Sequence, residues 1–121
     1  MEKEVGMYVR TKDGCICQIL RTTYLELYDE DILKASYNII DLIEEKDLVE
    51  IEYFSLRYNE RVTRLFEVSF KEGKYIYLSN AKCEFMLING EFNEVDKELK
   101  PIIKTIVTKE QFKSCMYKVG E

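Results

Sequence analysis

Cys15 and Cys17 are the first residues along the chain whose type and spacing could do chemistry. Two cysteines two positions apart on a strand face the same side, so with Cys83 and Cys115 they could form a four-cysteine zinc site. Zinc sites usually separate paired cysteines by about two to four residues, and Cys83 and Cys115 are isolated in the sequence. The spacing therefore favours cysteines that pack as small apolar side chains in a reducing compartment, with no bound metal and no disulfide.

Catalytic patterns are weak throughout the sequence. The chain has no histidine, which is the usual base that activates a serine or cysteine nucleophile. Its five glycines stand at expected turns or at a terminus and form no phosphate-binding loop. Paired acids could serve a hydrolase, but here the acids crowd into one run, which is more typical of a solvated face. We therefore expect a protein that is not an enzyme and needs no cofactor.

Negative charge is concentrated between Glu26 and Glu50, where nine acids face two lysines. The whole chain has a net charge of −5, so its remainder is slightly positive. This balance argues against a general nucleic-acid binder, whose affinity comes from many Lys and Arg side chains. Nine tyrosines could add rigid contact area to a negatively charged protein-binding face. We expect the protein-binding residues to be Glu26, Asp29, Glu30 and Asp31.

Residues 57–64, with the sequence RYNERVTR, give an alternative hypothesis. They interleave three arginines with an aromatic side chain at the expected tip of a hairpin. Such a tip could contact RNA phosphates and stack a base. The same arginines could instead pair with Glu52, Glu60 and Glu67 across strands. Under the RNA-binding hypothesis the contact residues are Arg57, Tyr58, Arg61 and Arg64.

The elements that must position these residues are mostly β-strands. Alternating apolar and polar residues, separated by turns such as Lys12-Asp13-Gly14 and Asn89-Gly90, predict a series of hairpins. The expected strands are residues 7–11, 15–20, 48–54, 61–70, 75–78, 84–88, 91–92, 102–107 and 116–119. A short helix or turn is expected over 38–45, although residues 37–40 fit the end of a strand equally well. A capping box at Thr108 and Gln111 predicts a short helix that runs to about Cys115.

The fold class follows from these elements. Many short strands joined by turns predict an all-β (β-rich α+β) fold, a small partly closed barrel of the Src-homology or Tudor type. Long hairpins and one short C-terminal helix would elaborate this barrel. A length of 121 residues predicts a single domain over 1–121. The expected core residues are Val9, Ile19, Ile40, Val49, Ile51, Phe66, Val68, Ile76, Phe85, Ile106, Val107 and Phe112.

Composition and the first residues of the sequence also indicate the cellular location that we expect. With 46% hydrophobic and 34% charged residues, the chain is neither disordered nor membrane-embedded. Its apolar runs are far shorter than the roughly 20 residues that a membrane helix needs. The sequence begins with the charged residues MEKE and has no secretory signal pattern. We therefore expect a cytoplasmic protein without a membrane partner.

Three stretches of the sequence resemble a known family. Residues 6–14 (GMYVRTKDG), 32–49 (ILKASYNIIDLIEEKDLV) and 103–121 (IKTIVTKEQFKSCMYKVGE) are similar to small uncharacterised proteins of phages and prophages of Gram-positive bacteria. The resemblance covers the two ends and the middle of the chain. It departs from the family pattern at Lys46, where a glycine commonly precedes an Asp-aliphatic strand. The hairpins between Arg57 and Gly90 look variable.

The resemblance implies a phage context and carries over no site residues, because none is established in that family. In this context small acidic proteins without enzymatic motifs often bind and inhibit a host defence protein, and an anti-CRISPR role is the sharpest form of that idea. We therefore expect a non-enzymatic phage or prophage accessory protein in the cytoplasm of its bacterial host. Its partner would be a host protein such as a CRISPR effector. The alternative is an RNA-binding small β-barrel that uses residues 57–64.

Overall fold

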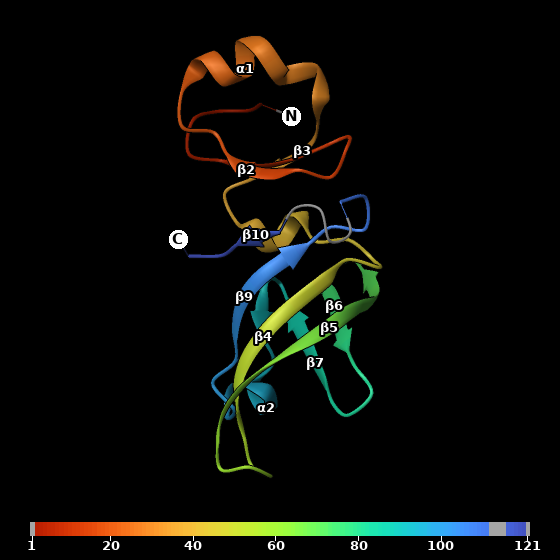
Figure 1. The fold of residues 1–121 in the computed structure, drawn as a ribbon. Helices are drawn as coiled ribbons and strands as arrows, with labels where there is room; N and C mark the ends of the chain where they lie inside the picture. Colours follow the sequence, from red (N-terminus) through yellow and green to blue (C-terminus); the bar gives the residue numbers. More distant parts are fainter. Residues whose placement is uncertain (1, 112–115, 121) are drawn as a thin grey trace.

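A computed structural model describes residues 2–111 and 116–120, which form two antiparallel sheets (Figure 1). The smaller sheet has the strand order β2-β1-β3, and the larger has the order β10-β9-β4-β5-β6-β7-β8. The strands are β1 (Tyr8–Thr11), β2 (Ile16–Gln18), β3 (Ile32–Ser36), β4 (Leu48–Ser55), β5 (Glu60–Glu72), β6 (Tyr75–Ser79), β7 (Glu84–Ile88), β8 (Glu91–Phe92), β9 (Ile102–Val107) and β10 (Tyr117–Lys118). The helices are α1 (Thr22–Tyr28), η1 (Asp29–Asp31), η2 (Ile39–Leu42) and α2 (Glu94–Lys97).

The larger sheet curls around the main core as a half-barrel. Figure 1 shows β9, β4 and β5 crossing in front of β6 and β7. Register shifts lie between Glu50 and Ile51 and between Val68 and Phe70, and such bulges increase strand twist. Inside the curl, the rings of Tyr53, Phe66 and Phe85 pack edge to face with centroids 5.1 to 6.1 Å apart. The prediction of a mostly β fold with a partly closed sheet is confirmed.

The smaller sheet builds a second, separate core. β1 is its central strand and pairs with both β2 and β3. The buried members of this core are Met7, Val9, Ile19, Ile32 and Ala35. Helix α1 lies across one side of this sheet and contacts it through the half-buried side chains of Tyr24 and Leu25 (Figure 1). Neither α1 nor β3 was expected, whereas every expected strand is present.

The predicted core is confirmed for all of its described members. The buried residues include Val9, Ile19, Ile40, Val49, Ile51, Phe66, Val68, Ile76, Phe85, Ile106 and Val107. Phe112 lies outside the described residues. The expected helical turn after Asn38 is η2, which begins where the Asn38 side chain accepts a hydrogen bond from the amide of Ile40 at 3.1 Å.

The expected helix after Thr108 is only partly described. Residues 109–111 form a turn, and residues 112–115 lie outside the described part of the chain. The Thr108 hydroxyl donates to the carbonyl of Gly14 at 2.7 Å, so it joins the loop after β9 to the first hairpin. A Cβ on Gly14 would lie 2.6 Å from the Thr108 Oγ1, and Gly14 has a φ of +86°. This close approach of two loops therefore requires glycine.

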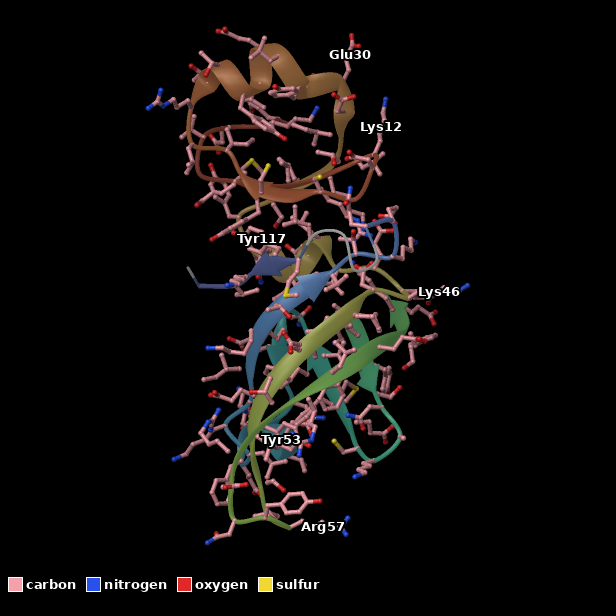
Figure 2. All side chains as sticks on the ribbon, in the orientation of Figure 1. Lys12, Glu30, Lys46, Tyr53, Arg57 and Tyr117 are labelled. Carbon is pink, nitrogen blue, oxygen red and sulfur yellow. The ribbon has the colours of Figure 1, made fainter. Side chains whose placement is uncertain are left out.

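Replacing Lys46 with glycine is expected to stabilise the protein by about 0.5–1 kcal/mol. Lys46 has a φ of +74°, in the left-handed region where a Cβ is strained, and its side chain extends into solvent (Figure 2). Urea unfolding measures the effect, and Lys46→Ala is the control because it removes the same charge but keeps the Cβ. A Lys46→Gly variant less stable than Lys46→Ala would contradict this prediction.

Candidate binding sites

Arg10 is fully buried between the smaller sheet and the larger one. Its Nη1 and Nη2 atoms donate to the Asp47 carboxylate at 2.5 and 2.9 Å, and Nη1 also donates to the carbonyl of Leu42 at 3.0 Å. Its Nη2 donates to Glu110 at 2.7 Å, and its Nε lies 3.6 Å from a carboxylate oxygen of Glu44. These contacts tie β1 to the loops before β4 and after β9.

Asp47, the main partner of Arg10, is also fully buried and is held by the backbone. Its carboxylate accepts hydrogen bonds from the amides of Glu44 at 2.8 Å and Lys109 at 3.0 Å. A buried charge pair is favourable only when its remaining hydrogen-bonding atoms are satisfied, as they largely are here.

The ionisation of this cluster reflects its contacts. Burial acts to lower the pKa of Arg10, but hydrogen bonds to Asp47 and Glu110 raise it above its ordinary value. Burial acts to raise the pKa of Glu44, but the charges of Arg10 and Lys34 together hold it below its ordinary value. The guanidinium and the Glu44 carboxylate are therefore both charged at neutral pH. We assign the cluster a structural role, because its central pair is enclosed.

The three stretches that resemble the phage family meet at this cluster. Arg10 comes from residues 6–14, Glu44 and Asp47 from residues 32–49, and Glu110 from residues 103–121. Sequence reasoning did not single out any of these residues. Residues from three distant segments of the chain therefore join the two sheets.

The predicted acidic residues form an acidic cap, defined as Glu26 on α1 with Asp29, Glu30 and Asp31 on η1. All four are exposed. Glu30 extends outward at the end of the molecule remote from the β4–β5 hairpin (Figure 2). Asp29 pairs with Lys3 at 2.9 Å, and the other three make no ion pair within the described residues. The structure thus brings the predicted protein-binding residues together on one exposed surface.

A pocket of about 430 Å³ adjoins this cap. The sequence did not predict this pocket. Asp31 and Asp13 supply two carboxylates to its lining and Lys12 supplies one ammonium group, and the ring centroids of Tyr24 and Tyr28 lie 5.1 Å apart there. The Thr11 hydroxyl donates to Asp13 and lowers the pKa of that carboxyl. Burial raises the pKa of Tyr24, so its ring stays neutral at physiological pH. We call this the cap pocket.

The second predicted set, residues 57–64, is divided by the structure. Arg57, Tyr58 and Arg64 line one pocket of about 420 Å³ at the tip of the β4–β5 hairpin. Arg61 lies elsewhere: its Nε donates to the Glu52 carboxylate at 3.0 Å, and its Nη2 donates to the carbonyl of Lys100 at 2.8 Å. Arg61 therefore makes the expected cross-strand ion pair, whereas Arg57 and Arg64 make none within the described residues. We call the pocket the tip pocket.

Aromatic side chains line the tip pocket, and two of them, Tyr53 and Phe85, belong to the main core. Tyr53, Phe54 and Phe85 line it, and Figure 2 shows Tyr53 further along β4 from the labelled Arg57. The Tyr53 hydroxyl lies 3.5 Å from the Cys83 sulfur. Burial raises the pKa of Tyr53 to about 12, the Cys83 contact adds to this rise, and the Arg64 charge opposes it. The pocket thus joins a neutral aromatic surface to cationic side chains.

Cys17 and Cys83 each pack beside a tyrosine. Cys17 lies 3.3 Å from the Tyr24 hydroxyl in the smaller sheet, while Cys83 lies beside Tyr53 in the larger one. Within residues 2–111 and 116–120, no group of three His, Cys, Asp or Glu side chains is arranged to hold a metal ion. Cys115 lies outside the described residues. None of the described helices is long and apolar enough to cross a membrane.

Fold and surfaces together define a class: a mostly β protein in which a curled seven-stranded sheet is joined to a small sheet with an acidic surface. Comparison with protein-family models, with curated proteins and with solved structures found no match. The membership of the phage family therefore stays a prediction, and the two pockets with the charges around them are the features that bear on function.

Proposed function

We propose that this protein works without catalysis, by binding a partner protein through its acidic cap. The observation that carries the proposal is the cap pocket, where Asp13 and Asp31 lie beside the rings of Tyr24 and Tyr28 and outnumber the one cation of the lining, Lys12. Carboxylates bind ammonium and guanidinium groups, and the faces of tyrosine rings attract the same cations. A lysine or arginine side chain of the partner fits this chemistry.

The surroundings of the pocket also suit a protein interface. Leu27 is 73% exposed and Tyr28 is 48% exposed, and both belong to α1, which buries none of its residues completely. Protein interfaces combine such apolar contacts with a polar rim. The exposed acids of the cap would speed encounter with a basic surface, and salt would weaken this attraction.

The resemblance to phage and prophage proteins supports a choice of partner. In that setting the protein would bind and inhibit a host defence protein, such as a CRISPR effector, in the bacterial cytoplasm. We further propose that the half-barrel is of the Src-homology or Tudor type, which is supported by the antiparallel β4-β5-β6-β7 meander. The cap would then be an addition to that barrel.

Capture from the lysate of a CRISPR-bearing Gram-positive host tests the proposal. With the tagged protein as bait, we expect a discrete protein to be retained at about 50 mM salt, with or without ribonuclease, and released at about 500 mM salt. Mass spectrometry identifies the captured protein. Loss of the captured material on ribonuclease treatment, or retention at high salt, would contradict capture by the acidic cap.

A further inference from the structure

We propose that the tip pocket binds a nucleotide unit, with the planar base against the aromatic side chains and the phosphate on the cations. Figure 1 places the β4–β5 tip at the opposite end of the molecule from α1, which carries part of the acidic cap. The inference therefore goes beyond the proposed function and does not depend on it.

The positive charge around the tip pocket favours an anionic ligand. The chain has a net charge of −5, yet Arg57, Arg64 and Lys82 gather in this lining. None of the three makes an ion pair within the described part of the chain, although Glu84 also lines the pocket. Cations without carboxylate partners beside an apolar surface attract an anion such as a phosphate.

The aromatic lining of the tip pocket suits a planar base. Small-molecule pockets measure about 300–1,000 Å³, and this one measures about 420 Å³. The half-buried rings of Phe54 and the neutral Tyr53 are available to a base there, whereas Phe85 is only 2% exposed and supports them from the core. Every nucleobase has a face that stacks on aromatic rings, whereas an acidic peptide would use the cations alone. The Arg57 guanidinium lies 5.5 Å from the centre of the Tyr58 ring, so charge and ring are already adjacent.

The tip pocket is accessible to a ligand from solvent. Leu56 and Tyr58 are exposed in the loop between β4 and β5, so the mouth of the pocket lies at the surface of the hairpin. A nucleotide could therefore enter free, or as one unit of a single strand that continues past the tip. Both sources present the same base and phosphate chemistry.

Fluorescence anisotropy with a labelled oligouridine of about ten nucleotides at low salt tests the inference. We expect saturable binding that Arg57→Ser with Arg64→Ser weakens at least tenfold, because two of the three cations of the lining are lost. Arg61→Ser is the matched control: it removes an arginine of the same hairpin that lies outside the pocket, and it should change affinity less than twofold. Tyr58→Ala should weaken binding by removing a ring at the mouth.

Competition separates the sources and the rival ligands. Displacement by UMP would support a site for free nucleotides, and displacement only by unlabelled oligouridine would support a site for single strands. Equal displacement by inorganic phosphate or by polyglutamate would overturn the inference, because the aromatic lining would then contribute nothing. Absence of binding by both oligouridine and UMP, or equal losses in Arg61→Ser and the double variant, would overturn it as well.

Discussion

Replacing Arg10 with methionine is expected to lower the free energy of unfolding by about 3–5 kcal/mol. Arg10 and Asp47 are both fully buried, so the substitution leaves a carboxylate in the interior without its positive partner. Methionine is similar in length and apolar, so the main loss is electrostatic. Because Arg10 lies between the two sheets, amide hydrogen exchange should also accelerate in β1 and β4.

Arg61→Met provides the matched control for this prediction. Arg61 also pairs with a glutamate, Glu52, but their side chains are 35% and 31% exposed, so its loss should change stability by no more than about 1 kcal/mol. Urea unfolding of both variants measures the difference. Adding Asp47→Asn to Arg10→Met should cost less than the sum of the two single changes. Equal losses in Arg10→Met and Arg61→Met would contradict a stabilising role for the buried cluster.

The hairpins could be predicted from the sequence because their signals are local. Asn89-Gly90 joins β7 to β8, and both residues have positive φ, as that turn requires. The alternation along β5 likewise predicted that Phe66 and Val68 lie in the core, where both are buried. It also placed Arg64 on their face and Arg61 on the other, which is how the structure divides the predicted RNA-binding residues.

The burial of Arg10 could not be predicted from the sequence, because an alternating pattern implies that one face of each strand is exposed to solvent. In β1, Val9 faces the small core, and Arg10 is covered on the other side by η2 and by the loops around Asp47 and Glu110. Val9 and Arg10 are both fully buried, and the next residue, Thr11, is only 7% exposed. Only the meeting of three distant segments produces this burial, and a hydrophobic pattern does not encode it.

Helix α1 and the cap pocket depend on similarly distant contacts. α1 has seven residues and contacts the small sheet through only Tyr24 and Leu25, which is too few for a clear helical period. The charge run identified Asp31 from composition alone. Asp13 joins it only because the β1–β2 hairpin and η1 line the same pocket.

Reversing three charges of the cap is expected to lower affinity for the captured partner at least about 100-fold. The variant carries Asp29→Lys, Glu30→Lys and Asp31→Lys, so attraction to a basic surface becomes repulsion, and the cap pocket loses one carboxylate. All three side chains are exposed, and among the residues that the structure describes the substitution removes one ion pair, the surface contact of Asp29 with Lys3. Stability should therefore change little.

The matched control reverses three exposed acids on the larger sheet and changes the net charge equally. Glu67, Glu72 and Glu91 serve this purpose, because none of them makes an ion pair in the described residues. Any difference between the two triple variants reports where on the surface the negative charge acts. Circular dichroism of both variants establishes that the fold is retained.

The most direct test of the central claim is titration calorimetry of the purified partner with these three proteins at about 50 mM salt. Partner capture by the cap predicts tight binding of the unaltered protein, and binding within about threefold of it for the Glu67, Glu72 and Glu91 control. It predicts a loss of at least about 100-fold for the cap variant. Binding by the cap variant at the unaltered affinity, or equal losses in both triple variants, would contradict the claim that the acidic cap holds the partner.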